Sequence, residues 1–416
     1  MIKSLYKHQR EAATFLINKQ HACLFHEVGT GKTNSAIYAV DNLPHGKLLI
    51  AAPACVIRGM WCIYDDLPIN QDVDILSYEF ISFHAREFSQ RHYDYVIADE
   101  CHKLKSIKSK CGKCFRMLTK HCQYVWGLTG TPYVTSFMDI YGIFFALNIK
   151  AFDETYDEFM HRVYKCDTIY IAPGKFIYKP VELKPGMMDL LVSRVSEYAS
   201  VLTADQCLTL PELTVKELLV NNMQTKEYLD CLKGIVTYSD KQDTINKLGC
   251  IQKLHQLSNG FIYNPDKTVN CVKYNLKLDL CENIVKMLLE ERDKLVIIYE
   301  YEYDRKCLKL LLDNAGISNT SELDDFSSMQ ILLLQEQSAV GINLQNYTNC
   351  MIFYTFSYSY LQYTQAVGRI HRSGQTKPCF VYVLINSHTS EGKIWQAVQK
   401  AYDMDTTFKS LCMGDE

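Results

Sequence analysis

The sequence predicts an α/β fold with two similar lobes, each built on a parallel β-sheet covered by helices. Short β-rich runs alternate with longer helical stretches, as they do in proteins of this class. The runs are apolar and show little alternation, as expected for strands buried on both faces. With 416 residues, the chain is too long for one hydrophobic core and about right for two or three domains.

The strand candidates form two groups along the chain. The first group is expected at residues 22–25, 47–52, 73–76, 95–98 and 124–128. The second group is expected at residues 295–299, 330–334, 350–354 and 379–385. The two groups predict two separate sheets, because about 165 residues of different texture lie between them.

The intervening stretch predicts helical insertions. Helical patterns occur at about residues 152–164, 186–198 and 223–257. Residues 173–185 and 208–211 have the proline content of connectors. We therefore expect one lobe at 1–200, with a helical insertion at about 134–200. The second lobe is expected at 201–416, with a helical insertion at about 223–260.

Composition excludes several classes of protein. Hydrophobic residues make up 48% and charged residues 22%, which excludes disorder as the main state. The longest apolar run stops at Arg58, short of the roughly 18 residues that a membrane span needs. The charged N-terminus has no signal-peptide apolar region. A net charge of -3 excludes a strongly basic nucleic-acid binder but allows a local basic groove.

Cysteine is unusually frequent, with 17 residues and no secretory signal. This pattern predicts reduced thiols in an intracellular compartment, either the cytoplasm of a prokaryote or an infected cell, or the nucleus. Cys111 and Cys114 have the spacing of a zinc knuckle. The alternative, which we prefer, is that they lie on one face of a helix.

A phosphate-binding loop is the strongest local signal. The sequence His-Glu-Val-Gly-Thr-Gly-Lys-Thr at 26–33 follows an expected strand and opens an expected helix. Gly29 and Gly31 let the backbone curl so that its N–H groups face phosphate oxygens, and the helix N-terminus adds positive charge. Lys32 then reaches the β and γ phosphates, and the Thr33 hydroxyl can bind Mg²⁺.

Two adjacent carboxylates complete this candidate site. Asp99 and Glu100 follow the apolar strand expected at 95–98, where Mg²⁺-binding acids lie in such folds. Asp99 is expected to hold Mg²⁺, and Glu100 to orient and deprotonate the attacking water. The expected cofactors are therefore ATP and Mg²⁺.

These motifs and those that follow resemble the superfamily 2 helicases, in the right order along the chain. Upstream, His8 and Gln9 resemble the glutamine motif that contacts adenine. The matching segments, from motif I to motif VI, are 29–33, 49–54 (with Trp61 following), 75–78, 99–102, 128–132, 340–344 and 365–375.

Within that superfamily the sequence is most similar to the Swi/Snf-type remodelling translocases. Gly-Arg-Ile-His-Arg-Ser-Gly-Gln at 368–375 is highly specific for that group, and Gly-Ile-Asn-Leu at 341–344 supports it. The residues at 25–27 resemble virus-encoded forms of the same enzymes. The resemblance implies two RecA-like lobes with helical insertions between motifs III and V.

The sequence also departs from the family pattern. Ser338 and Ala339 stand where Gly-Gly is usual, and Glu336 stands where a basic residue is frequent. His26 replaces the usual aspartate. The segment between the strands at 295–299 and 330–334 is short, which puts the DNA contacts of the second lobe in doubt.

The resemblance implies roles for particular residues. The catalytic set would be Lys32, Asp99, Glu100, Arg369 and Arg372. The nucleotide would be bound by Gln9, Gly29, Thr30, Gly31, Lys32, Thr33 and Gln365, and Mg²⁺ by Thr33 and Asp99. Coupling of the nucleotide to DNA would use His102, Thr129 and Thr131. Contacts to the DNA backbone would come from Arg58, Ser77 and Asn343. Arg369 and Arg372 are three residues apart, so on a helix they would share a face and reach the γ-phosphate together when the lobes close.

Two further segments have open interpretations. Residues 103–120 contain seven Lys or Arg and no acid, and either flank a DNA groove or form a solvated helix face. The tyrosine-rich segment at 354–363 suggests base stacking, although core packing beside motif VI is favoured.

The expected function is a DNA-stimulated ATPase that translocates on double-stranded DNA and remodels DNA or protein–DNA complexes. Alternatives are a strand-separating or branch-remodelling helicase and, less favoured, a nucleotide-dependent clamp that does not hydrolyse. RNA as the activating polymer stays open. A monomer is expected, with DNA and a targeting protein as partners and no membrane association.

Overall fold

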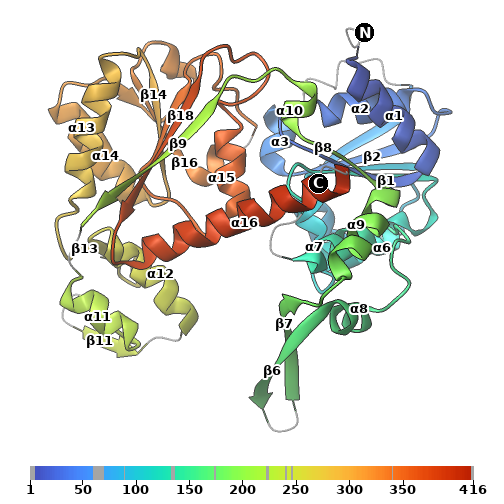
Figure 1. Ribbon diagram of the computed structural model, residues 1–416, viewed down its shortest axis with the longest axis horizontal. Helices are drawn as coiled ribbons and strands as arrows, with labels where there is room; N and C mark the ends of the chain where they lie inside the picture. The colour runs from blue at the N-terminus through green and yellow to red at the C-terminus, as the bar shows by residue number, and fades with distance from the viewer. Residues whose placement is uncertain are drawn as a thin grey trace. The chain divides into compact units, whose positions relative to one another are not determined.

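The computed structural model divides into two units (Figure 1). It describes residues 5–59, 70–88, 90–132, 136–172, 175–221, 224–238, 241–244, 247–339 and 341–413. Unit 1 comprises residues 1–209 and 401–416, and unit 2 comprises residues 210–400. Among the described helices, none combines the length and apolar character needed to cross a lipid bilayer.

Unit 1 is built on a six-stranded sheet in the order β3-β2-β4-β5-β1-β8, and every neighbouring pair is parallel. The strands are β1 His21–His26, β2 Lys47–Ala52, β3 Asp72–Ser77, β4 Tyr95–Asp99, β5 Tyr124–Leu128 and β8 Ala199–Leu202. Every residue of β4 is buried, as are five of the six in β1 and in β2. The predicted parallel sheet of the first lobe is therefore confirmed.

Helices cover the sheet of unit 1 and supply its core. They are α1 Lys7–Lys19, α2 Lys32–Asp41, α3 Ala54–Gly59, α4 Tyr78–Phe83, α5 Ala85–Phe88, η2 Cys101–Leu104, α6 Lys110–Leu118, η3 Thr119–His121, α7 Phe137–Ala146, α8 Tyr156–Val163, α9 Met187–Tyr198 and α10 Ala204–Cys207. The α7 helix packs its aromatic residues against the sheet, and Phe144 stacks on Phe25 of β1 at 6.1 Å between ring centroids. The core thereby fixes the ends of β1, β4 and β5, which carry the candidate site.

The insertion of unit 1 is only partly helical. Strands β6 Tyr164–Ala172 and β7 Lys175–Leu183 form an antiparallel hairpin that projects from the unit (Figure 1). The interpretation of 173–185 as a connector was therefore wrong for β7. Pro180 suggested a loop, but it lies opposite Cys166 in a two-stranded ribbon, where an edge position tolerates the missing N–H.

Unit 2 repeats the same architecture. Its sheet has the order β15-β16-β14-β17-β18-β9, again entirely parallel. The strands are β9 Leu213–Val220, β14 Leu295–Tyr299, β15 Asn319–Thr320, β16 Ile331–Gln335, β17 Cys350–Phe353 and β18 Cys379–Asn386. Together with unit 1, this confirms the prediction of two RecA-like α/β lobes.

Helices and small hairpins complete unit 2. The helices are α11 Lys226–Leu232, α12 Lys247–Ser258, α13 Lys277–Leu289, α14 Glu302–Asn314, η4 Asp324–Ser327, η5 Glu336–Ala339 and α15 Tyr360–Val367. The hairpins are β10 Ile235–Tyr238 with β11 Lys241–Thr244, and β12 Phe261–Tyr263 with β13 Val269–Cys271. The insertion expected at about 223–260 thus contains α11, α12 and a hairpin between them.

The last helix, α16 Ser390–Met413, contributes to both units. Residues up to 400 belong to unit 2, whereas 401–416 belong to unit 1. Phe408 is fully buried in the core of unit 1 and packs edge-on against Phe137 at 5.4 Å. The sequence had placed the boundary at 200/201 and the entire C-terminal segment in the second lobe.

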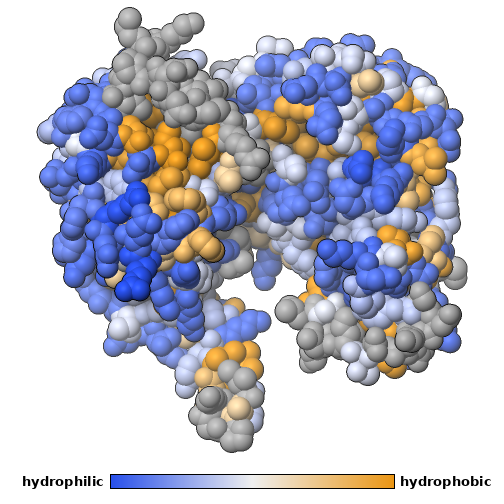
Figure 2. Space-filling view, turned by 180° about the vertical axis from the view of Figure 1, so that it is seen from behind, coloured by the Kyte–Doolittle hydropathy of each residue, from blue (hydrophilic) through white to orange (hydrophobic). Residues whose placement is uncertain are grey.

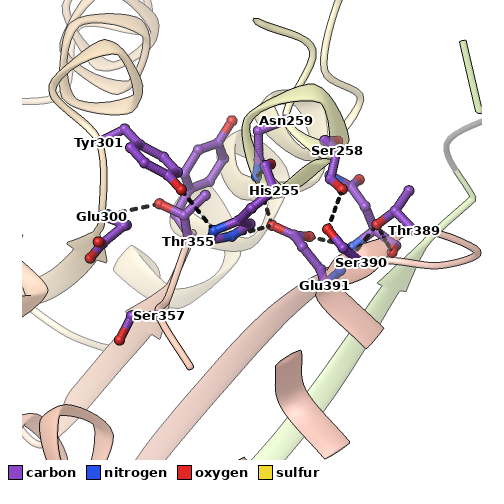
Figure 3. A network of polar contacts seen from close by, with 12 residues as sticks. His255, Ser258, Asn259, Glu300, Tyr301, Thr355, Ser357, Thr389, Ser390 and Glu391 are labelled. Carbon is purple, nitrogen blue, oxygen red and sulfur yellow. Dashed lines mark hydrogen bonds and ion pairs between the residues drawn. The ribbon is translucent and has the colours of Figure 1, made fainter. Parts of the chain in front are cut away.

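A buried polar network fixes the start of α16 within unit 2 (Figure 3). Glu391 is fully buried and accepts hydrogen bonds from Lys277 Nζ at 2.7 and 2.9 Å and from Asn259 Nδ2 at 2.8 Å. Burial alone would raise the pKa of Glu391, but Lys277 and His255 lower it to about 2. Removing either member of this ion pair would cost roughly 3–5 kcal/mol, because an unpaired charge would stay buried. The network therefore joins the end of α12 to α13 and to the start of α16.

Candidate nucleotide site

The loop between β1 and α2 has the curl that a phosphate site needs. Gly29 and Gly31 have φ of 88° and 85°, a region that glycine enters without strain. A Cβ on Gly31 would lie 2.0 Å from Gln9 Nε2, so the loop also depends on the close approach of α1. The phosphate loop expected at 26–33 is thus a strand–turn–helix unit in the structure.

Lys32 is directed back over this loop. Its Nζ donates to the carbonyls of His26 at 2.8 Å and Glu27 at 3.1 Å. Burial lowers the pKa of Lys32, and the nearby carboxylates of Glu100 and Asp99 act in the opposite direction. The ammonium is therefore close to both acids and is held by neutral acceptors that phosphate oxygens can replace.

Asp99 and Glu100 end β4 in the same unit. Asp99 is buried, its Oδ1 accepts from Glu100 N at 3.0 Å, and its carbonyl accepts from Tyr78 Oη at 2.8 Å. Glu100 has φ of 51°, a left-handed conformation that is strained for a side chain of this size. The turn re-aims the second carboxylate away from the strand direction.

The donor set fits a hard cation. The hydroxyl of Thr33 and the carboxylates of Asp99 and Glu100 are oxygen groups of the kind that Mg²⁺ prefers. Within the part of the chain that the structure describes, no group of three or more His, Cys, Asp or Glu side chains is arranged to hold a metal. Cys111 and Cys114 instead lie on α6, and their thiols face the carbonyls of Tyr78 and Ala85 at 3.9 and 3.6 Å.

The three coupling candidates are connected to Glu100. His102 Nδ1 lies 3.2 Å from Glu100 Oε2 and also 3.2 Å from Thr129 Oγ1. Thr129 Oγ1 accepts from the backbone N–H of Thr131 at 3.2 Å. A continuous polar chain thus runs from the carboxylate after β4 to the loop after β5. Thr131 Oγ1 is buried and has no hydrogen-bond partner among the described residues.

Gln9 lies against the phosphate loop. Its Nε2 donates to Thr30 O at 3.1 Å, and His8 Nε2 lies 2.9 Å from the same carbonyl. Its Oε1 accepts from Tyr6 N at 3.1 Å, which caps the start of α1. The residue expected to contact adenine is therefore positioned beside the loop.

His26 occupies the position of the family's usual aspartate as a buried neutral side chain. Its Nε2 lies 2.9 Å from Ser200 Oγ on β8. Burial and the nearby Lys32 lower the pKa of His26 to about 3. The imidazole is therefore neutral at physiological pH and packs against β8.

This burial predicts a pH dependence of stability. Between pH 7 and pH 5, His26 gains a proton in the unfolded chain but not in the folded one, so stability falls as the pH falls. The contribution of His26 to this loss is expected to be about 2 kcal/mol in the free energy of unfolding. Urea unfolding at both pH values should give a change in stability from pH 7 to pH 5 that is less favourable in wild type than in His26→Gln by this amount. The exposed His121→Gln is the control, and equal pH dependence in wild type and His26→Gln would contradict the assignment.

The two motif VI arginines lie in unit 2 in a turn and not on a helix. Helix α15 ends at Val367, with Gly368 as its C-cap, so the expected shared helix face was wrong. The chain tightens there because His371 N and Ile370 N both donate to Val367 O. Arg369 is buried, and its Nε donates to Gln365 O at 3.1 Å.

Arg372 has a side-chain N–H donor that no described residue accepts from. Its Nη1 donates to Asn343 Oδ1 at 2.8 Å, and its buried Nε has no hydrogen-bond partner among the described residues. Burial lowers the pKa of Arg372, although guanidinium remains charged. Motifs V and VI are thus joined through Asn343, a residue that sequence reasoning assigned to DNA.

The remaining candidates have mixed outcomes. Gln365 is buried on α15. Ser77 caps α4 by accepting from Phe80 N at 3.1 Å. Arg58 lies on α3, but its side chain and Trp61 fall outside the described residues. In the tyrosine-rich segment, Tyr363 packs on Trp395 at 5.3 Å, so core packing accounts for it.

Glu336 explains one departure from the family pattern. It is buried at η5, and its Oε2 accepts from Ser357 N at 2.8 Å. Burial and the neighbouring Glu300 carboxyl raise the pKa of Glu336 to about 8. The side chain is therefore mainly protonated at neutral pH, which lets an acid occupy this buried position.

Lys409 and Asp405 of α16, which lie beside the loop, were not identified from the sequence. Lys409 Nζ on α16 lies 3.2 Å from Glu27 Oε1 and 2.7 Å from Asp405 Oδ2. Glu27 Oε2 accepts from Ala204 N at 2.9 Å. The one sequence feature at this contact is the segment at 25–27 before the glycines, where His26 departs from the family pattern.

The fold and the site together define a class: a P-loop nucleotide hydrolase with two RecA-like lobes. A family model described as the SNF2-related domain matches residues 58–262. The chain is therefore similar to the Swi/Snf-type ATPases of superfamily 2. The resemblance drawn from the motifs is confirmed.

Curated relatives agree with this assignment. The chain is 22% identical to an uncharacterized ATP-dependent helicase of Mycoplasma genitalium, over 97% of this chain and 42% of the relative. It is 24% identical to an uncharacterized ATP-dependent helicase of Bacillus subtilis, over 93% and 76%. A third relative is the human SWI/SNF-related regulator of chromatin subfamily A member 1, at 23% over 94% and 42%.

The chain spans 42% of the length of two of these relatives and 76% of the third. Among solved structures, the Sulfolobus solfataricus SWI2/SNF2 ATPase core in complex with dsDNA is 19% identical. It covers 99% of this chain and 94% of that one, with a TM-score of 0.43.

Proposed function

We propose that the chain is a DNA-stimulated ATPase that translocates along double-stranded DNA and remodels DNA or protein–DNA complexes. The observation that carries the proposal is the polar chain from Glu100 through His102 and Thr129 to Thr131. It links the candidate general base to the loop after β5, whose family role is coupling. A clamp that only binds nucleotide has no need for such a link.

Five candidate site residues of unit 1 have roles in this proposal. Lys32 leaves the carbonyls of His26 and Glu27 and binds the β and γ phosphates of ATP. Thr33 and Asp99 would hold Mg²⁺, which would supply positive charge to the phosphates. Glu100 orients and deprotonates the attacking water. His102 keeps the Glu100 carboxylate in place from 3.2 Å away.

Unit 2 supplies the arginine side chains of the proposed reaction. Arg372 carries its charge at all physiological pH values and has an unused buried Nε. We assign it the stabilisation of charge in the loose transition state, with Asn343 holding its Nη1. Arg369 bonds to the carbonyls of Gln365 and Ile342, which favours a supporting role for it.

DNA binding is assigned to phosphate contacts, which need no base code. Arg58, Ser77 and Asn343 remain the proposed contacts. Ser77 also caps α4, and Asn343 also accepts a hydrogen bond from Arg372, so substituting either residue would affect structure as well. Several lysines at 103–120 are exposed, whereas Arg116 packs over Phe145 at 4.5 Å and is engaged within the unit.

Two assays test the motor activity. Displacement of the third strand of a triplex on blunt duplex DNA reports translocation, and release of a labelled strand from a fork reports unwinding. We expect ATP-dependent triplex displacement with little unwinding, because a motor that grips phosphates avoids the roughly 1.4 kcal/mol needed to open each base-pair step. The ATPase should respond to duplex more than to single strands or RNA. Efficient fork unwinding without triplex displacement would overturn this proposal.

The β6–β7 hairpin favours the strand-separating alternative. Tyr170, Phe176 and Tyr178 are 60%, 55% and 49% exposed on it. Figure 2 shows hydrophobic surface on this projection. Aromatic rings of this kind stack on unpaired bases. If the motor opens forks, replacing the three aromatics with serine should abolish opening and leave duplex-stimulated hydrolysis intact.

A further inference from the structure

The C-terminal segment of α16 places a buried cation beside the phosphate loop. Lys409 is 2% exposed and lies 2.7 Å from Asp405 Oδ2 on its own helix, one turn earlier. It also lies 3.2 Å from Glu27 Oε1, a residue of the loop between β1 and α2. Phe408, the preceding residue, is fully buried in the core of unit 1, so this part of α16 is firmly packed.

Glu27 joins three parts of unit 1. Its Oε1 meets Lys409, its Oε2 accepts from Ala204 N at 2.9 Å, and its carbonyl accepts from Lys32 Nζ at 3.1 Å. Its backbone N–H donates to Leu202 O at 2.9 Å at the end of β8. The position of Glu27 therefore sets the position of the first turn of the loop.

Charge makes the Lys409 contact more than a packing interaction. Burial alone would lower the pKa of Lys409, but Asp405 and Glu27 outweigh it and raise the pKa above its ordinary value. The residue thus stays charged at neutral pH and forms ion pairs with two carboxylates. Lys409 is also close enough to Lys32 to act on its charge. Loss of Lys409 would leave Glu27 free to draw Lys32 toward its own carboxylate.

We propose that Lys409 is a positioning residue for ATP binding, which acts by holding Glu27 so that Lys32 is released to the phosphates. This inference rests on the proposed ATPase function. It makes residues 401–413 part of the nucleotide site, although they follow motif VI by about 30 residues in the sequence. Lys409 itself touches neither phosphate nor water in the reaction.

The test compares variants of the full chain in duplex-stimulated hydrolysis. Lys409→Met keeps the length of the side chain and removes its charge, whereas Lys409→Arg keeps the charge. Glu27→Gln removes the partner's charge and can still accept from Ala204 N. The exposed Lys400→Met on the same helix is the matched control. Thermal unfolding and direct binding of a fluorescent ATP analogue are measured on each protein.

We expect Lys409→Met to raise the KM for ATP and weaken analogue binding by about tenfold to a hundredfold, with a much smaller change in kcat. Lys409→Arg should recover most of the affinity. The double variant Lys409→Met with Glu27→Gln should bind ATP no worse than Lys409→Met, because both changes remove the same contact.

Three outcomes would overturn the inference. The first is wild-type affinity in a folded Lys409→Met protein. The second is full additivity of the two substitutions. The third is a lowered melting temperature with unchanged KM, which would make the contact merely structural. An inactive wild-type protein would instead count against the proposed ATPase function, so the two failures are distinguishable.

Discussion

Lys32→Ala is expected to reduce DNA-stimulated ATP hydrolysis by at least about a hundredfold, the scale seen when one preorganised transition-state donor is removed. Lys32 is the closest cation to the loop's own carbonyls, at 2.8 and 3.1 Å. No other side chain of the loop can supply an ammonium to the β and γ phosphates. ATP affinity should fall as well, because the same contact exists in the ground state.

The measurement is phosphate release at saturating duplex, with Lys19→Ala as the control. Lys19 is an exposed lysine in the last turn of α1, in the same unit. The loss of two hydrogen bonds to carbonyls also relaxes the loop, so Lys32→Met, which restores bulk without charge, should be equally inactive. Turnover within a few-fold of wild type in either Lys32 variant would show that the loop is not the phosphate site.

The central strands could be predicted because strands buried on both faces consist of nearly continuous apolar residues. β2, β5 and β14 have the predicted bounds, and β1, β4, β16, β17 and β18 differ by at most one residue at either end. β8 and β9 were missed. β9 lies at the sheet edge, has mostly exposed or half-buried residues and includes Lys216 and Glu217, so it lacks a continuous apolar run.

The chemistry of the site was predictable only where residues act close together in sequence. Gly29, Lys32 and Glu100 are recognisable because turns and strand ends give fixed spacing. Lys409 is 382 residues from Glu27, so no short sequence motif contains both residues. Arg369 and Arg372 suggested a helical face from spacing alone, but the end of α15 depends on backbone bonds that no spacing reveals.

Glu100→Gln is expected to keep ATP binding and to lower hydrolysis by about a hundredfold to ten-thousandfold, the range for a positioned general base. The carboxylate is 16% exposed and lies 3.2 Å from His102 Nδ1. Glutamine has the same size and can adopt the same left-handed backbone, so the turn after β4 should persist. Its amide cannot take a proton from water, whereas Asp99 would still be available to hold Mg²⁺.

The experiment separates binding from chemistry. Analogue binding and single-turnover hydrolysis are measured for Glu100→Gln, with the exposed Glu11→Gln of α1 as the control. Wild-type affinity with slow single-turnover chemistry is the expected result, and it contrasts with Lys32→Ala, where both should fail. Because Glu100 begins the polar chain to Thr129 and Thr131, duplex DNA should no longer accelerate the residual hydrolysis. If Glu100→Gln instead loses ATP affinity as severely as Lys32→Ala, Glu100 serves binding and another group must activate the water.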